Sequence, residues 1–216
     1  MPISAAMPLS PAISPAISEV ALAIRVLVSL VFLTAAYGKL RHWAVFQGVV
    51  ANYRLLPQGL VAPVAYALPP IEALLGAALL LGLGSPWPEL TAAALLLLFA
   101  LAMGINIARG RRHIDCGCFQ SALKQTLNWT MVIRNIVLSL LLGLAITSLG
   151  TPDDLFALVN GWLVGGVLFI ILQSLNILWS IVPAWRRFSR NGAAPEAATH
   201  EAATHEASAH EAGARS

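Results

Sequence analysis

The sequence predicts an all-α fold: a polytopic membrane helical bundle of about five transmembrane helices plus one interfacial amphipathic helix. Composition is the first reason, since 58% of the 216 residues are hydrophobic and only 11% are charged. Soluble domains average about 45–50% apolar and about 25% charged residues. Patterning is the second reason, because five apolar stretches each approach the roughly 20 residues that a helix needs to cross a bilayer.

Each apolar stretch is expected to be a helix, because backbone groups in lipid must find hydrogen-bond partners within their own segment. The stretches lie at about 19–38, 60–84, 88–108, 129–149 and 155–182. Short connections with proline, at 85–88 and 151–154, predict that spans two and three, and spans four and five, form helical hairpins. Pro69 and Pro70 predict a kink in the second span.

The segment 39–57 has a different pattern from the spans. Its apolar residues recur at helical spacing and its polar residues occupy other faces. The apolar positions are Trp43, Phe46, Val49 or Val50, and Tyr53. This pattern favours an amphipathic helix lying in the membrane interface over an ordinary loop.

Three parts are expected along the chain. Residues 1–18 form a flexible leader, because they are rich in proline, serine and alanine and lack the basic residues of a signal peptide. Residues 19–185 form the transmembrane domain. Residues 186–216 form a low-complexity tail, with a five-residue repeat over 196–215.

The distribution of basic residues predicts the orientation in the membrane. Lys and Arg follow the first, third and fifth spans, and the connections on the other side carry none. The basic residues counted are Lys39, Arg41, Arg54, Arg109, Arg111, Arg112, Lys124, Arg186, Arg187 and Arg190. By the positive-inside rule, the N-terminus lies outside, and the loop after the third span lies at the cytoplasmic face with the C-terminus.

That loop contains the only two cysteines, Cys116 and Cys118, separated by one glycine. A disulfide between them would close a small, strained ring, and strained disulfides are the labile, catalytic ones. Arg111, Arg112 and His113 lie just upstream, and positive charge favours the reactive thiolate.

This pattern favours a redox pair, so Cys116 and Cys118 are the predicted catalytic residues. Two alternatives stay open. His113 and the two thiolates suit zinc or Cu(I), although no fourth ligand lies nearby and no metal is assigned. The cysteines are otherwise small residues with a structural role.

The ionisable residues inside the predicted spans include Arg25, Glu72 and Arg134, in spans one, two and four. A charge at membrane depth costs a few kcal/mol, so such residues face the bundle interior and pair. We expect a structural polar core in which Glu72 pairs with Arg25 or Arg134. The functional alternative is a core that positions a quinone or relays protons; no other cofactor is indicated. No basic stripe interleaved with aromatic residues is present, so a nucleic-acid partner is not expected.

Several strings together resemble the MauE branch of the DoxX/MauE-like membrane proteins. They are "RVLVSLVFLTAAYGKL", "ANYRLLP", "LPPIEALLGAALLLGLG", "IRNIVLSLLL" and, most specific, "DCGCF" after a membrane helix. The resemblance implies a multi-pass protein of the bacterial inner membrane that serves methylamine utilisation. It implies a role in maturation, export or disulfide formation of the methylamine dehydrogenase small subunit.

The resemblance also implies two protein partners, a thioredoxin-like protein of the MauD type and the small subunit itself. Electrons would pass through Cys116 and Cys118. Whether the chain is itself an enzyme stays open. The alternative functions are a non-catalytic membrane scaffold or export factor with structural cysteines, and a metal-handling membrane protein.

Overall fold

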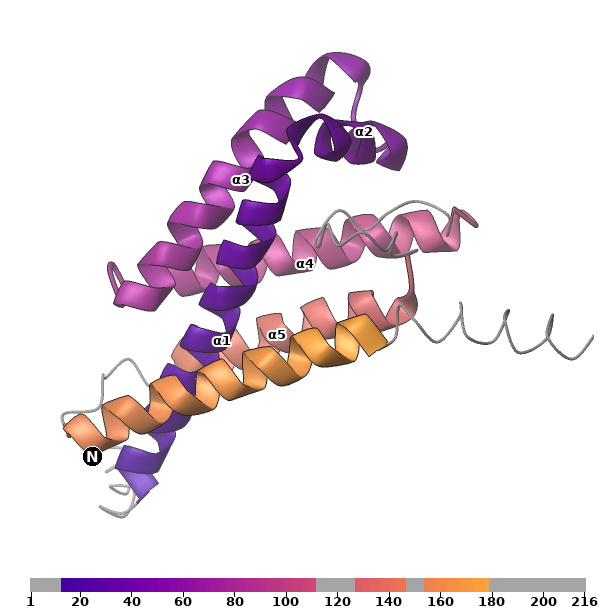
Figure 1. The fold of residues 1–216 in the computed structure, drawn as a ribbon. Coiled ribbons are helices and arrows are strands. Elements are labelled where there is room, and N and C mark those ends of the chain that lie inside the picture. Colours follow the sequence, from indigo (N-terminus) through magenta and orange to yellow (C-terminus); the bar gives the residue numbers. More distant parts are fainter. Residues whose placement is uncertain (1–12, 112–126, 147–153, 179–216) are drawn as a thin grey trace, which may run out of the picture. The chain divides into compact units, whose positions relative to one another are not determined.

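A computed structural model describes residues 13–111, 127–146 and 154–178, and every regular element in them is a helix (Figure 1). The helices are α1 (Ile13–Arg41), α2 (Trp43–Tyr53), α3 (Gln58–Leu81), α4 (Trp87–Ala108), α5 (Trp129–Ile146) and a sixth helix, Leu155–Leu178. Five of them, all except α2, are long and apolar enough to cross a membrane. The predicted all-α class is therefore confirmed.

Helix bounds differ from the predicted spans mainly at α1, which begins at Ile13 and ends at Arg41. Helix α3 continues through Pro63, Pro69 and Pro70. It ends at Leu81, and Gly82 directly after it has φ 65°, the left-handed conformation typical of a helix C-terminus. The predicted tail and the end of the predicted fifth span lie outside the described residues.

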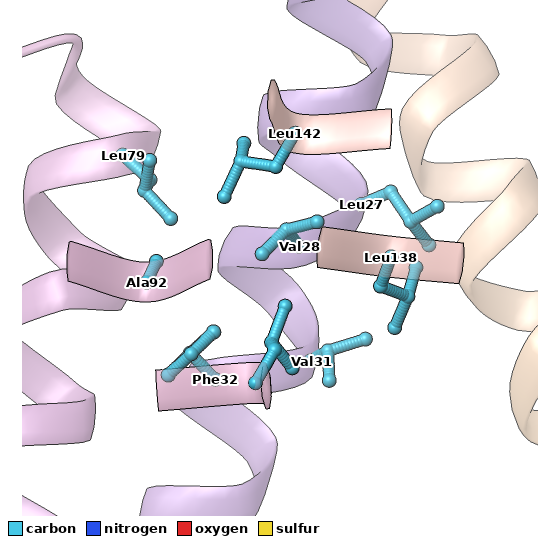
Figure 2. Close-up of a cluster of buried hydrophobic side chains, with 9 residues drawn as sticks. Leu27, Val28, Val31, Phe32, Leu79, Ala92, Leu138 and Leu142 are labelled. Carbon is cyan, nitrogen blue, oxygen red and sulfur yellow. The ribbon is translucent and has the colours of Figure 1, made fainter. Parts of the chain in front are cut away.

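Helix α1 is the most buried of the spans. Within the bundle, 56% of its apolar window is buried, against 17% to 33% for the other four spans. Its side chains form the centre of a core cluster shared with α3, α4 and α5 (Figure 2). The buried members are Leu27, Val28, Val31, Phe32, Leu79, Ala92, Leu96, Leu138 and Leu142. Because lipid tails are as apolar as leucine, close packing of this kind is what holds membrane helices together.

Helix α2 has the predicted amphipathic pattern. Phe46 and Val49 are buried, whereas Arg54 at its end is exposed. The Trp43 ring packs on Tyr66 of α3, with 4.2 Å between ring centroids. The apolar face of α2 therefore covers part of the bundle itself, and the location of this helix in the membrane interface stays a prediction.

The sixth helix approaches α1 through two glycines spaced four residues apart. Residues up to Leu172 form one compact unit, and those from Gln173 belong to a second. In the first unit, a Cβ added at Gly165 would lie 2.7 Å from the carbonyl oxygen of Ala23. A Cβ at Gly161 would lie 2.8 Å from the side chain of Leu22. These glycines permit the close helix approach that small residues provide in membranes.

Replacing Gly165 with leucine should destabilise the bundle by about 1–3 kcal/mol, because overpacking forces neighbouring groups apart. Gly166→Leu is the matched control, since no atom lies within 4 Å of a Cβ placed there. Denaturant unfolding of both purified proteins in one detergent measures the difference. Equal stability of the two variants would contradict the close contact with α1.

Candidate functional site

The first buried ion pair joins Lys39, in the last turn of α1, to Glu72 on α3. The Lys39 ammonium donates a hydrogen bond to Glu72 Oε1, and the two residues are only 3% and 1% exposed. The Nζ atom also lies 5.2 Å from the ring centroid of Phe46 and 5.1 Å from that of Phe99. One carboxylate and two aromatic rings, from three different helices, thus surround this ammonium.

The second buried ion pair joins Arg25 of α1 to Glu89 in the first turn of α4, with 3.2 Å between Nε and Glu89 Oε1. Ser85 Oγ donates to the same carboxylate oxygen at 2.9 Å. Arg25 Nη2 and Glu89 Oε2 are buried without a hydrogen-bond partner among the described residues. This pair lies fourteen residues from Lys39 along α1, about 21 Å along the helix axis.

The third predicted core residue, Arg134 of α5, lies near the first pair. It lines a small cavity of about 20 Å³ together with Lys39, Glu72, Phe99 and Asn135. Its guanidinium donates to Asn135 Oδ1 at 3.4 Å. The structure therefore brings Glu72 and Arg134 to the same place, and puts Arg25 at the other pair.

The expected pairing of Glu72 needs correction in one respect. The prediction named Arg25 or Arg134 and missed Lys39, which donates to Glu72, while Arg25 pairs with Glu89 instead. Lys39 and Glu89 were missed because both lie near span ends, where charges usually face water. One signal was present in the sequence: Arg25, Phe32 and Lys39 recur every seven residues and so share one face of α1.

The cysteine loop can be followed at both ends. The N–H of Gly110 donates to Ile107 O and that of Arg111 to Asn106 O, the paired bonds that close a helix C-terminus. At the far end, Leu127 is buried against the C-terminal part of α4, in a cluster with Met103 and Ile107. Both ends of the loop are thus held at one end of the α4–α5 helix pair.

The predicted reactive residues themselves, Cys116 and Cys118, lie outside the described residues, as do Arg112 and His113. Arg111 is described and is half-buried directly after α4. Within residues 13–111, 127–146 and 154–178, no cluster of His, Cys, Asp and Glu side chains could hold a metal ion. The redox and metal roles of the loop stay predictions.

Helix α2 packs at the same end of the bundle as the two described ends of the cysteine loop. Tyr53 of α2 packs against the cluster that contains Ile107 and Leu127, the residues near the loop ends. Lys39, however, is buried in an ion pair, so it contributes no free charge at that end of the bundle. Arg41, Arg54 and Arg109 remain exposed there.

Five apolar spans and two buried ion pairs define a multi-pass helical membrane protein whose spans are tied together by charge as well as by packing. The family model described as methylamine utilisation protein MauE matches residues 17–148. The chain belongs to the MauE family, and it is a multi-pass membrane protein of bacterial type.

Curated relatives support this assignment. The chain is 40% identical over 164 residues to methylamine utilization protein MauE of Paracoccus denitrificans, covering 75% of this chain and 88% of the relative. It is 41% identical over 158 residues to the protein of the same name from Paracoccus versutus, covering 72% and 85%. The corresponding Methylorubrum extorquens protein is 37% identical over 157 residues, covering 72% and 84%. No solved structure matches the chain.

Proposed function

We propose that this chain acts in the bacterial inner membrane in maturation of the methylamine dehydrogenase small subunit, by thiol–disulfide exchange through Cys116 and Cys118. Its direct partner in this proposal is a thioredoxin-like protein of the MauD type. The observation that carries the proposal is the family match, because residues 17–148 include both cysteines. The names of the relatives support the pathway, methylamine utilisation.

The proposed exchange uses both cysteines. A thiolate of one attacks a disulfide of the partner, which forms a mixed disulfide and releases the partner's second sulfur as a thiolate. The thiolate of the other cysteine then displaces the partner. The chain is left with a Cys116–Cys118 disulfide, and the partner has gained two electrons and, after protonation, two thiols. The same bond exchanges in reverse move electrons in the other direction.

The described ends of the loop suit this role. The Gly110 and Arg111 hydrogen bonds end α4 shortly before Cys116, and Leu127 returns the chain to the bundle. The fifteen residues between these points are tethered at both ends, which limits how far the cysteine pair extends from the membrane protein.

Trapping the mixed disulfide tests the proposal. In cells that contain the thioredoxin-like partner, Cys116→Ser or Cys118→Ser should leave one thiol able to form the intermolecular bond but unable to resolve it. We expect a reducible adduct of the two proteins on non-reducing gels with at least one single variant. Absence of an adduct with both single variants, in cells where partner and chain are present, would argue against direct exchange.

The orientation of the loop is a separate prediction. The basic residues predict the cytoplasmic face. On that side the pair could not directly oxidise a periplasmic substrate and would instead receive reducing equivalents from the cytoplasm. Alkaline phosphatase fused after Gln120 should therefore be inactive, and the same enzyme fused after Gly84 should be active. The opposite result would place the cysteines outside and favour direct exchange there.

A further inference from the structure

A cavity of about 330 Å³ lies among α2, α3 and α4. Its walls include Phe46 and Val50 of α2, Leu68 of α3, and Phe99 and Met103 of α4. Lys39 is the one charged residue among the described residues that line it. Ligand sites typically have volumes of about 300–1,000 Å³, mostly apolar walls and a few polar groups that orient the ligand. The cavity has these properties.

The Lys39 ammonium is a charged hydrogen-bond donor at the wall of a mostly apolar cavity. It has three N–H groups, and one of them donates to Glu72 Oε1. The rings of Phe46 and Phe99 lie about 5 Å from Nζ and also line the cavity. A flat ring that carries an acceptor would meet both the donor and the aromatic side chains at this end.

The charge balance at Lys39 indicates which kind of acceptor fits. Glu72 already neutralises the ammonium, and Arg134 lines the neighbouring small cavity and not this one. A second carboxylate or a phosphate in the larger cavity would therefore bring like charge toward a buried acid. A carbonyl oxygen accepts a hydrogen bond without adding charge. An acyl chain alone would fill the apolar space but would offer the donor nothing.

We propose that this cavity binds a lipid-soluble quinone, with a ring carbonyl accepting a hydrogen bond from Lys39 Nζ. The quinone ring lies beside Phe46 and Phe99, and its tail leaves past Leu98, which lines the cavity and is 57% exposed on the outer surface of α4. The proposal concerns binding alone. It goes beyond the proposed cysteine chemistry and does not depend on it.

Direct binding to the full-length chain in quinone-free lipid nanodiscs tests the site, with a short-chain benzoquinone analogue as the probe. Ala102→Phe fills the cavity from α4 and should weaken binding at least about tenfold, a loss of about 1.4 kcal/mol. Ala94→Phe places the same side chain on the exposed face of α4 and should leave affinity unchanged. Equal affinity of these two variants would overturn the assignment to this cavity.

The role of Lys39 needs a variant that does not strand Glu72 as a lone buried charge. The Lys39→Met, Glu72→Met double variant removes both charges and should bind the analogue about 10- to 100-fold more weakly, as expected for loss of a hydrogen bond to a charged donor. Unchanged affinity would refute the carbonyl contact.

Two measurements on the wild-type chain complete the test. When the wild-type chain is purified from membranes that contain quinone, organic extraction of the purified protein should yield quinone. Extraction of the Ala102→Phe variant should yield none. Binding of oleate and of the benzoquinone analogue is measured separately, each in the absence of the other. A wild-type chain that binds oleate but not the analogue would show that the cavity is a fatty-acid site, and this result would overturn the proposal. Failure of the cysteine-trapping experiment would leave this binding result unaffected, so the two proposals fail separately.

Discussion

Replacing Glu72 with leucine is expected to destabilise the bundle by about 3–5 kcal/mol, because breaking a buried ion pair leaves an uncompensated charge. The stranded charge would be the Lys39 ammonium, which is 3% exposed and borders Phe46 and Phe99. Unfolding of the purified chain in a fixed detergent mixture, followed by circular dichroism, measures the loss. Asn52→Leu, at an exposed polar residue of α2, should change stability by less than about 0.5 kcal/mol.

A double variant separates pairing from burial. If Lys39 and Glu72 stabilise the fold by compensating each other, Lys39→Met combined with Glu72→Leu should recover most of the loss, since apolar residues replace buried pairs at little cost. The coupling energy is obtained from the two single variants and the double variant. A double variant as unstable as the sum of its singles would show that the two residues act independently.

The architecture could be predicted because membrane insertion imposes strong local rules. Apolar runs of about 20 residues in this chain have one stable conformation, so the described helices α3, α4 and α5 lie close to their predicted ranges. The spacing of Phe46 and Val49 likewise predicted the buried face of α2. These features depend on neighbours within one segment, which the sequence displays directly.

The ion-pair partners could not be predicted in the same way. Pairing depends on how far α3 and α4 are shifted along α1, and a single sequence contains no measure of that shift. The prediction counted Lys39 only among the basic residues that follow the first span, whereas Lys39 and Glu89 meet acidic and basic partners on other helices. Hydropathy marked Arg25 and Glu72 as costly, but it did not rank their partners.

The cysteine pair was singled out on chemical grounds, because two thiols separated by one glycine after a basic run favour reactive thiolates. Arg111 and Leu127 are the described residues that flank the cysteine segment, and both are held against the bundle. Family membership adds that the matched region contains both thiols. The proposed redox role is tested by replacing both thiols.

The Cys116→Ser, Cys118→Ser double variant is expected to reduce maturation of the methylamine dehydrogenase small subunit to the level of a strain that lacks this chain. Without either thiol, no mixed disulfide forms and no electron pair passes to or from the partner. The measurement is active dehydrogenase, and the disulfide state of its small subunit, in a deletion strain that expresses each variant. Immunoblots of membranes establish that the variants are present in equal amounts.

Asn128→Ser is the matched control, because Asn128 is exposed at the described end of the same loop and the substitution also introduces a serine. It should leave maturation at the wild-type level. The double cysteine variant should also unfold at the same denaturant concentration as the wild type, since serine is close in size to cysteine and the core clusters around Val28 and Met103 are unchanged. Normal maturation by the double variant would contradict redox chemistry and favour a scaffold or export role, in which the bundle itself and not its thiols serves the dehydrogenase.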